Sequence, residues 1–100
     1  MNIALDYDRT FTEDPHLWDF FVAMCLHRGH KVFIVTMRHD HEVLELETPR
    51  GVPVIFTGRR MKEKHCADKH GVKIDIWIDD MPCMIQEGKL LNFISTDEEL

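Results

Sequence analysis

The chain has no apolar run that approaches the ~20 residues of a membrane span, which argues against a transmembrane segment. The N-terminus has the pattern of a strand with an acid at position 6, which is not the pattern of a signal peptide. The cysteines, Cys25, Cys66 and Cys83, are odd in number and widely spaced, and no Cys-x-x-Cys pair occurs. We therefore expect reduced thiols in a cytoplasmic protein without a membrane partner.

Basic residues are also scarce, because 12 Lys and Arg stand against 18 Asp and Glu and give a net charge of −6. This balance argues against broad, sequence-independent binding of nucleic acid, although it leaves room for a local basic patch. No internal repeat or low-complexity segment is present. A chain of 100 residues that is 44% apolar predicts one soluble globular domain over residues 1–100 with a single modest core.

Short apolar segments alternate with amphipathic ones along the whole chain. Apolar residues at consecutive positions are typical of buried parallel strands. We predict strands at residues 2–6, 31–36, 54–56, 75–79 and 90–94, and helices at residues 15–28, 41–47 and 60–70, with one helical turn at 83–86. The alternation predicts the α/β class, with a three-layer Rossmann-like parallel sheet.

The first helix has clear signals at both ends. Asp14 is a typical N-cap, Pro15 suits the first helical position, and Gly29 suits the position after the last turn. Trp18 and Trp77 are expected in or near the core. The buried face of the helix is expected to consist of Leu17, Phe20, Phe21 and Met24, with Val22 and Cys25 beside them.

Oxygen-bearing side chains follow three of the predicted strands. Asp6 and Asp8 follow the first strand, Thr36 ends the second, and Asp79 and Asp80 follow the fourth. The carboxyl ends of parallel strands meet at one edge of a sheet, where such sheets bind ligands. Carboxylate oxygens without Cys or His at these positions favour Mg²⁺ over zinc.

Basic residues follow the third strand, near the same edge. Lys62 lies at the start of a helix and closest to the acids, whereas Lys64 is about 200° further around that helix and should point elsewhere. The sequence favours Lys62 as the lysine of the site and keeps Lys64 as the alternative. Arg38, Arg59 and Arg60 could join Lys62 in steering a phosphorylated ligand to this edge.

These motifs together resemble those of the haloacid dehalogenase superfamily of phosphatases. Leu5-Asp6-Tyr7-Asp8-Arg9-Thr10 matches the first motif, an apolar run followed by Asp-x-Asp-x-Thr. Ile34-Val35-Thr36 matches the second, and Ile78-Asp79-Asp80 matches the fourth. The resemblance spans residues 3–80 and implies a single phosphatase domain of this fold.

The resemblance also implies roles for the site residues. Asp6 would be the nucleophile that forms an aspartyl-phosphate, and Asp8 the general acid and then the general base. Mg²⁺ would bind the Asp6 carboxylate, the Asp8 backbone carbonyl and a fourth-motif acid, with Asp80 favoured as the direct ligand. Asp79 would act through water or pair with the lysine. Thr36 would donate a hydrogen bond to a phosphoryl oxygen, and Lys62 would complete the catalytic set.

Many relatives carry a cap domain, but residues 8–14 and 37–53 are too few to form one. A capless site suits a phosphate on a nucleotide, a nucleic-acid end or a protein, unless a neighbouring subunit of a homo-oligomer covers it. His39 and His41 lie near the site, where they either contact substrate or face solvent. The expected function is a Mg²⁺-dependent phosphomonoesterase, and the alternative is a phosphate-accepting or catalytically idle binding module.

Overall fold

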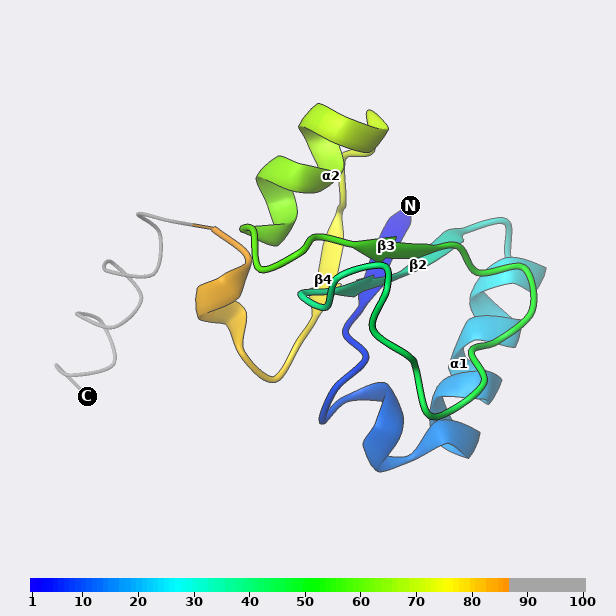
Figure 1. The fold of residues 1–100 in the computed structure, drawn as a ribbon. Helices are drawn as coiled ribbons and strands as arrows, with labels where there is room; N and C mark the ends of the chain where they lie inside the picture. Colours follow the sequence, from blue (N-terminus) through cyan, green and yellow to red (C-terminus); the bar gives the residue numbers. More distant parts are fainter. Residues whose placement is uncertain (87–100) are drawn as a thin grey trace, which may run out of the picture.

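The structure, a computed structural model, describes residues 1–86 and consists of one parallel four-stranded sheet with helices (Figure 1). The strands are β1 (Asn2–Leu5), β2 (Lys31–Thr36), β3 (Val54–Phe56) and β4 (Ile76–Ile78). The helices are α1 (Pro15–His27) and α2 (Lys62–His70), with short 3-10 helices η1 (Phe11–Glu13) and η2 (Pro82–Met84). The α/β class and the parallel sheet are confirmed and are compatible with a Rossmann-like fold; the predicted strand at 90–94 lies outside the described residues.

The strand order is β3-β2-β1-β4. β2 and then β3 are added on one side of β1, and β4 then pairs with the other edge of β1. Ile3 and Leu5 of β1 pair with Ile76 and Ile78 of β4. The chain leaves β1 toward β2 on one side, whereas β4 is added on the other side of β1, so the strand order reverses between β1 and β4. Sheets of this kind bind ligands in the crevice at the carboxyl ends of the strands at such a point. The fold thus provides a ligand position between β1 and β4.

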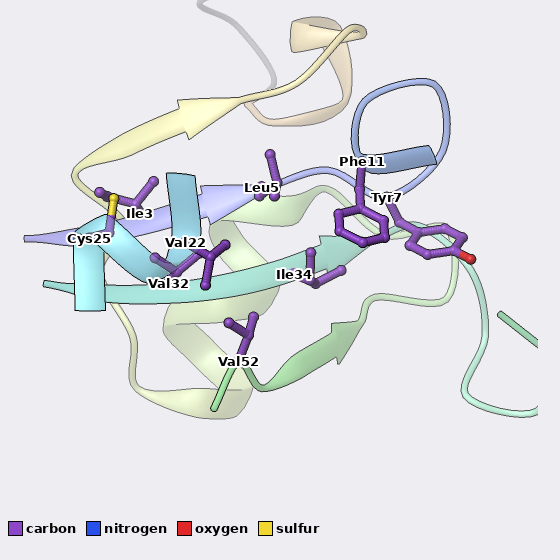
Figure 2. Packing of buried hydrophobic residues seen from close by; sticks show 9 residues of the cluster. All are labelled: Ile3, Leu5, Tyr7, Phe11, Val22, Cys25, Val32, Ile34 and Val52. Carbon is purple, nitrogen blue, oxygen red and sulfur yellow. The ribbon is translucent and has the colours of Figure 1, made fainter. Parts of the chain in front are cut away.

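One face of the sheet packs against α1. Ile3, Leu5 and Val32 of the sheet lie against Val22 and Cys25 of α1 (Figure 2). At the carboxyl end of β1, the rings of Tyr7 and Phe11 stack with their centroids 5.9 Å apart, and both side chains are fully buried. This aromatic pair fixes the chain on either side of the predicted Asp8 loop.

The opposite face packs against α2, whose Cys66 lies against Ala4 and Val35. Burial raises the pKa of the Cys66 thiol to about 11, which keeps it protonated and unreactive. Trp18 packs against the first cluster and Trp77 against the second, as predicted. Within residues 1–86, no helix has the length and apolarity needed to cross a membrane.

The predicted buried face of α1 is wrong in part. Val22 and Cys25 are buried, but the side chains of Leu17, Phe20 and Met24 are 53%, 78% and 61% exposed. Apolar residues surround this helix on all sides, so the apolar pattern does not select a face. The sheet contacts residues about one turn apart, at positions 18, 22 and 25.

The predicted helix at residues 41–47 is absent, because the whole connection from β2 to β3 is irregular. Side chains from other parts of the chain bind the backbone groups that a helix would use. The Tyr7 hydroxyl accepts from the Leu46 N–H at 2.8 Å and donates to the Leu46 carbonyl at 3.3 Å, and Arg38 Nη1 donates to the Val43 carbonyl at 2.6 Å. These tertiary bonds replace the local ones.

Candidate functional site

Three carboxylates meet in the crevice between β1 and β4. The Asp6 N–H donates to the Ile78 carbonyl at 2.9 Å, so strand-like pairing continues past the end of β1 and places Asp6 beside the acids that follow β4. One oxygen from each of Asp6, Asp79 and Asp80 lies within 4.8 Å of the others. Asp6 is 7% exposed, whereas Asp80 is open to solvent. The cluster is therefore anchored in the core and reachable from outside.

Lys62, the first residue of α2, extends into this cluster and is only 2% exposed. Its Nζ lies 2.7 Å from Asp6 Oδ1 and 2.5 Å from Asp79 Oδ2. Lys64 is exposed on another side of the helix, as the ~200° separation predicts. Of the two candidate lysines, the structure thus brings Lys62 to the acids.

Thr10 is a further site residue, to which the sequence reasoning assigned no role. Its hydroxyl donates to Asp6 Oδ2 at 3.3 Å, and its carbonyl accepts from Trp18 Nε1 at 2.8 Å. The Phe11 N–H donates to the Asp6 carbonyl at 3.1 Å. The sequence feature that could have identified Thr10 is its position four residues after Asp6. A tight turn between the two residues brings the Thr10 hydroxyl back to the Asp6 carboxylate.

Burial raises the pKa of Asp6 to about 7 from 3.8. The hydrogen bond and positive charge of Lys62 act in the opposite direction, while Asp80 and Asp79 raise the pKa further. Desolvation of the charged carboxylate thus outweighs its lysine partner. Without a cation, Asp6 is partly protonated near neutral pH.

This shift predicts a pH-dependent stability for the metal-free protein. Between pH 4 and pH 7 the folded state binds a proton that the unfolded state releases, so the free energy of unfolding should fall as pH rises through this window. The slope should be at most about 1.4 kcal/mol per pH unit. Urea unfolding in a chelator would measure it, and Asp6→Asn should flatten this part of the curve. The exposed Asp68→Asn should leave the slope in place, and an equal flattening in both variants would contradict the assignment to Asp6.

The donor set fits a hard divalent cation. Lys62 already binds Asp6 Oδ1 and Asp79 Oδ2, and the Met81 N–H donates to Asp79 Oδ1 at 2.9 Å. Both oxygens of Asp79 therefore accept short bonds, whereas Asp6 Oδ2 accepts only the longer bond from Thr10 at 3.3 Å. Asp6 Oδ2 and the carboxylate of Asp80 thus keep the most capacity to bind a cation. Two carboxylates with water in the remaining positions are what Mg²⁺ commonly uses.

Asp8 points away from the three clustered carboxylates. Its oxygens accept from Arg38 Nη2 at 2.7 Å and from Arg38 Nε at 3.0 Å, and half of the Asp8 side chain is exposed. The guanidinium lies 5.3 Å from the centre of the Tyr7 ring and also pairs with Glu45 at 3.2 Å. The hydrogen bonds to Asp8 and Glu45 raise the pKa of Arg38, so the guanidinium stays charged in this bidentate arrangement.

Five of the predicted site residues line one cleft of about 190 Å³, and Thr36 does not. Thr36 is buried at the end of β2, where its Oγ1 accepts from the Arg38 N–H at 3.2 Å. The predicted residues in the cleft are Asp6, Asp8, Lys62, Asp79 and Asp80, and its other lining residues are Arg9, Met37, Met81 and Met84.

The predicted basic rim is largely neutralised. Arg38 pairs with Asp8, Lys62 is buried, and Arg59 lies 3.1 Å from a carboxylate oxygen of Glu42. Of the four predicted residues, Arg60 alone forms no ion pair within residues 1–86.

The two loop histidines lie outside the cleft. His39 and His41 stack with ring centroids 5.3 Å apart, and both are exposed. His39 also packs on Gly58, where a Cβ would come within 2.9 Å of its Nδ1. Gly58 has a φ of +61°, so both space and backbone conformation favour glycine there.

Chemically, the cleft offers a buried carboxylate whose charge is balanced by a lysine, an accessible second carboxylate and a nearby paired acid. Such a set can bind a cation and, through it, a phosphoryl group. Comparison with protein-family models, curated proteins and solved structures finds no match to this chain. The functional interpretation therefore depends on the chemistry of these side chains.

Proposed function

We propose that the chain is a Mg²⁺-dependent phosphomonoesterase, a capless phosphatase similar to the haloacid dehalogenase superfamily, that works through an aspartyl-phosphate. The observation that carries this proposal is the buried Lys62 Nζ, 2.7 Å from Asp6 and 2.5 Å from Asp79, beside the accessible Asp80. An acid placed this way is a nucleophile whose orientation is fixed by its lysine. A structural ion pair alone would not need the third, exposed carboxylate.

In the first step, an oxygen of Asp6 attacks phosphorus while the ester P–O bond breaks. Lys62 holds Asp6 Oδ1, so the carboxylate keeps one orientation, and the positive charge of Lys62 reduces repulsion of the phosphate dianion. Thr10 bonds Asp6 Oδ2 and further restricts the carboxylate. Water then attacks the aspartyl-phosphate, which releases inorganic phosphate and restores Asp6.

Asp6 and Asp80 would hold the metal, and Asp79 would keep Lys62 in place. When bound, Mg²⁺ supplies charge neutralisation between the nucleophile and the phosphate. The cation would also favour the ionised form of Asp6, whose pKa burial raises to about 7 in the metal-free protein. Asp6 would thereby become a full nucleophile at neutral pH.

Asp8 would give its proton to the leaving oxygen and later take one from the attacking water. In the structure Asp8 is bound by Arg38 instead, at 2.7 and 3.0 Å. Arg38 must therefore release Asp8 before the acid can act. A phosphate group is a suitable competitor for the guanidinium because it offers the same bidentate acceptor geometry.

The surroundings of the cleft support an accessible substrate. The β1–α1 connection contains only η1, and the β2–β3 connection contains no helix, so neither forms a cap. The phosphate could be carried by a nucleotide, a nucleic-acid end or a protein, or a second subunit could cover a small substrate.

The direct test is hydrolysis of an aryl phosphate at pH 7 with and without Mg²⁺. We expect turnover with Mg²⁺ and a loss of about a hundredfold or more in excess chelator, because Lys62 is already paired with two carboxylates and the metal supplies the further positive charge that the phosphate needs. Ca²⁺ should substitute poorly, because it prefers more ligands and looser geometry. Equal rates with Mg²⁺ and with chelator would exclude the proposed mechanism.

A phosphate-accepting module without fast turnover is the second candidate, and the Asp8–Arg38 pair favours it. An Asp8 that stays bound to Arg38 cannot activate water, so the aspartyl-phosphate would persist. Incubation with acetyl phosphate and mass analysis of the intact chain distinguishes the two. A phosphatase returns to the unmodified mass within minutes, whereas an accepting module retains the added phosphoryl group.

A further inference from the structure

A cleft of about 350 Å³ lies along α2, apart from the cleft that contains the acids. Its basic lining residues are Arg60, Lys64 and Lys69, and one acid, Asp68, lies among them. Within residues 1–86 none of the three cations forms an ion pair. Among residues 1–86 the lining therefore carries three cations against one acid, on a chain whose net charge is −6.

His65 lines the same cleft and has an unmet hydrogen-bonding requirement. Its Nδ1 is buried and has no hydrogen-bond partner among the described residues. Burial lowers the pKa of His65, and the charges of His70, Arg60 and Lys69 lower it further, so the ring is neutral at pH 7. Buried polar atoms without a partner are rare, so this ring nitrogen has an unused bonding capacity that a ligand atom would meet once the ring turns toward the cleft.

The cleft and the candidate site share α2. The helix begins with Lys62 in the candidate site, and Lys69 lies seven residues later, about 10 Å further along the axis at 1.5 Å per residue. Arg60 lies two residues before Lys62, so along the helix axis the cations of the cleft begin level with the candidate site and extend beyond it. They line a side of α2 that Lys64 faces and Lys62 does not. A small molecule with one phosphate would not reach Lys69, whereas a polymer with repeated phosphates would meet one cation after another.

We propose that this cleft binds the phosphodiester backbone of a single-stranded nucleic acid whose phosphorylated end enters the candidate site. That the phosphate at this end is the group hydrolysed rests on the proposed function. Met61, which also lines the cleft, offers apolar surface to a base, and His65 offers its ring nitrogen. A phosphoprotein lacks negative charge at regular spacing, so it would engage the site but not this series of cations.

The experiment measures binding of a fluorescent, 5′-phosphorylated oligothymidine to the full chain carrying Asp6→Asn, which prevents turnover. Three phosphate contacts predict a slope of about −2 for log K against log salt. Lys64→Ala with Lys69→Ala should weaken binding about tenfold and reduce the slope to about −0.7. The matched control, Lys31→Ala with Lys73→Ala, removes the same charge from exposed positions at the amino ends of β2 and β4 and should leave affinity unchanged.

Equal weakening by the two double variants, or no measurable binding to the oligonucleotide, would overturn the cleft assignment. Tighter binding of a phosphopeptide with the same dependence on Lys64 and Lys69 would overturn the choice of nucleic acid. A second readout uses the active chain, in which the Lys64 and Lys69 double variant should lose kcat/KM for the oligonucleotide and keep it for an aryl phosphate. Binding that depends on Lys64 and Lys69 without any hydrolysis would instead refute the proposed function, while the assignment of the cleft as a nucleic-acid site would stand.

Discussion

Asp6→Asn should reduce kcat for aryl-phosphate hydrolysis by a factor on the order of 10⁴ while leaving the fold intact. The asparagine side chain has nearly the same shape, and its one oxygen can still accept from Lys62, which bonds Asp6 Oδ1 at 2.7 Å. Its amide nitrogen takes the place of Asp6 Oδ2 and can donate to the Thr10 hydroxyl, which lies 3.3 Å from that oxygen. It has no nucleophilic oxygen and no charge for a metal ion. Initial rates at saturating Mg²⁺, with circular dichroism to monitor folding, test this expectation.

The matched control is Asp68→Asn, which makes the same chemical change on the exposed face of α2 and should keep the wild-type rate. Trapping of the aspartyl-phosphate adds a separate readout, because only a chain with Asp6 should gain a phosphoryl group from acetyl phosphate. An Asp6→Asn variant with wild-type turnover would show that the nucleophile lies elsewhere.

Lys62→Met should lower the free energy of unfolding by roughly 3 kcal/mol at pH 8, because it leaves two buried carboxylates without their cation. Asp6 and Asp79 lie 2.7 and 2.5 Å from Nζ, so both are affected. Methionine fits the volume of the lysine stem, which limits the packing loss. Chemical unfolding in a chelator measures this change in the free energy of unfolding. Addition of Mg²⁺ should restore part of the lost stability, because the ion places a new positive charge among the acids.

Lys64→Met provides the control, since Lys64 is exposed two residues further along the same helix. Its effect should stay within about 0.5 kcal/mol. Similar losses in the two variants would mean that Lys62 stabilises the protein only through helix formation. A Lys62 variant that Mg²⁺ does not stabilise more than the wild type would argue against a metal position among these carboxylates.

The acids of the site could be located from the sequence because two simple rules agree on them. Runs of consecutive apolar residues identify buried parallel strands, and the carboxyl ends of such strands share one edge. Asp6, Asp79 and Asp80 follow two of these runs directly, and the structure brings them within 4.8 Å. Lys62 could be chosen over Lys64 because it lies at the start of the helix, closest to the acids, and because helical periodicity turns Lys64 about 200° away.

Contacts between distant parts of the chain could not be predicted in this way. The pair of Arg38 with Asp8 joins residues 30 apart through an irregular loop, and no local pattern specifies it. Residues 41–47 of the same loop were predicted as a helix, because local helix propensity contains no information on the distant Tyr7 hydroxyl that binds the Leu46 N–H. The exposed Phe20 was predicted to be buried for a related reason. A helix with apolar residues on all sides gives no sequence pattern that identifies the side facing the sheet.

The position of β4 beside β1 has a consequence for the order of biosynthesis. Asp6 is synthesised before Lys62, and the bond between them closes a separation of 56 residues. Asp79 and Asp80 follow β4, the last of the described strands, so a nascent chain that lacks this segment has only part of the cluster. Capture of a cation by the three acids would therefore report that the segment through Asp80 is present and that the crossover from β3 to β4 has been completed.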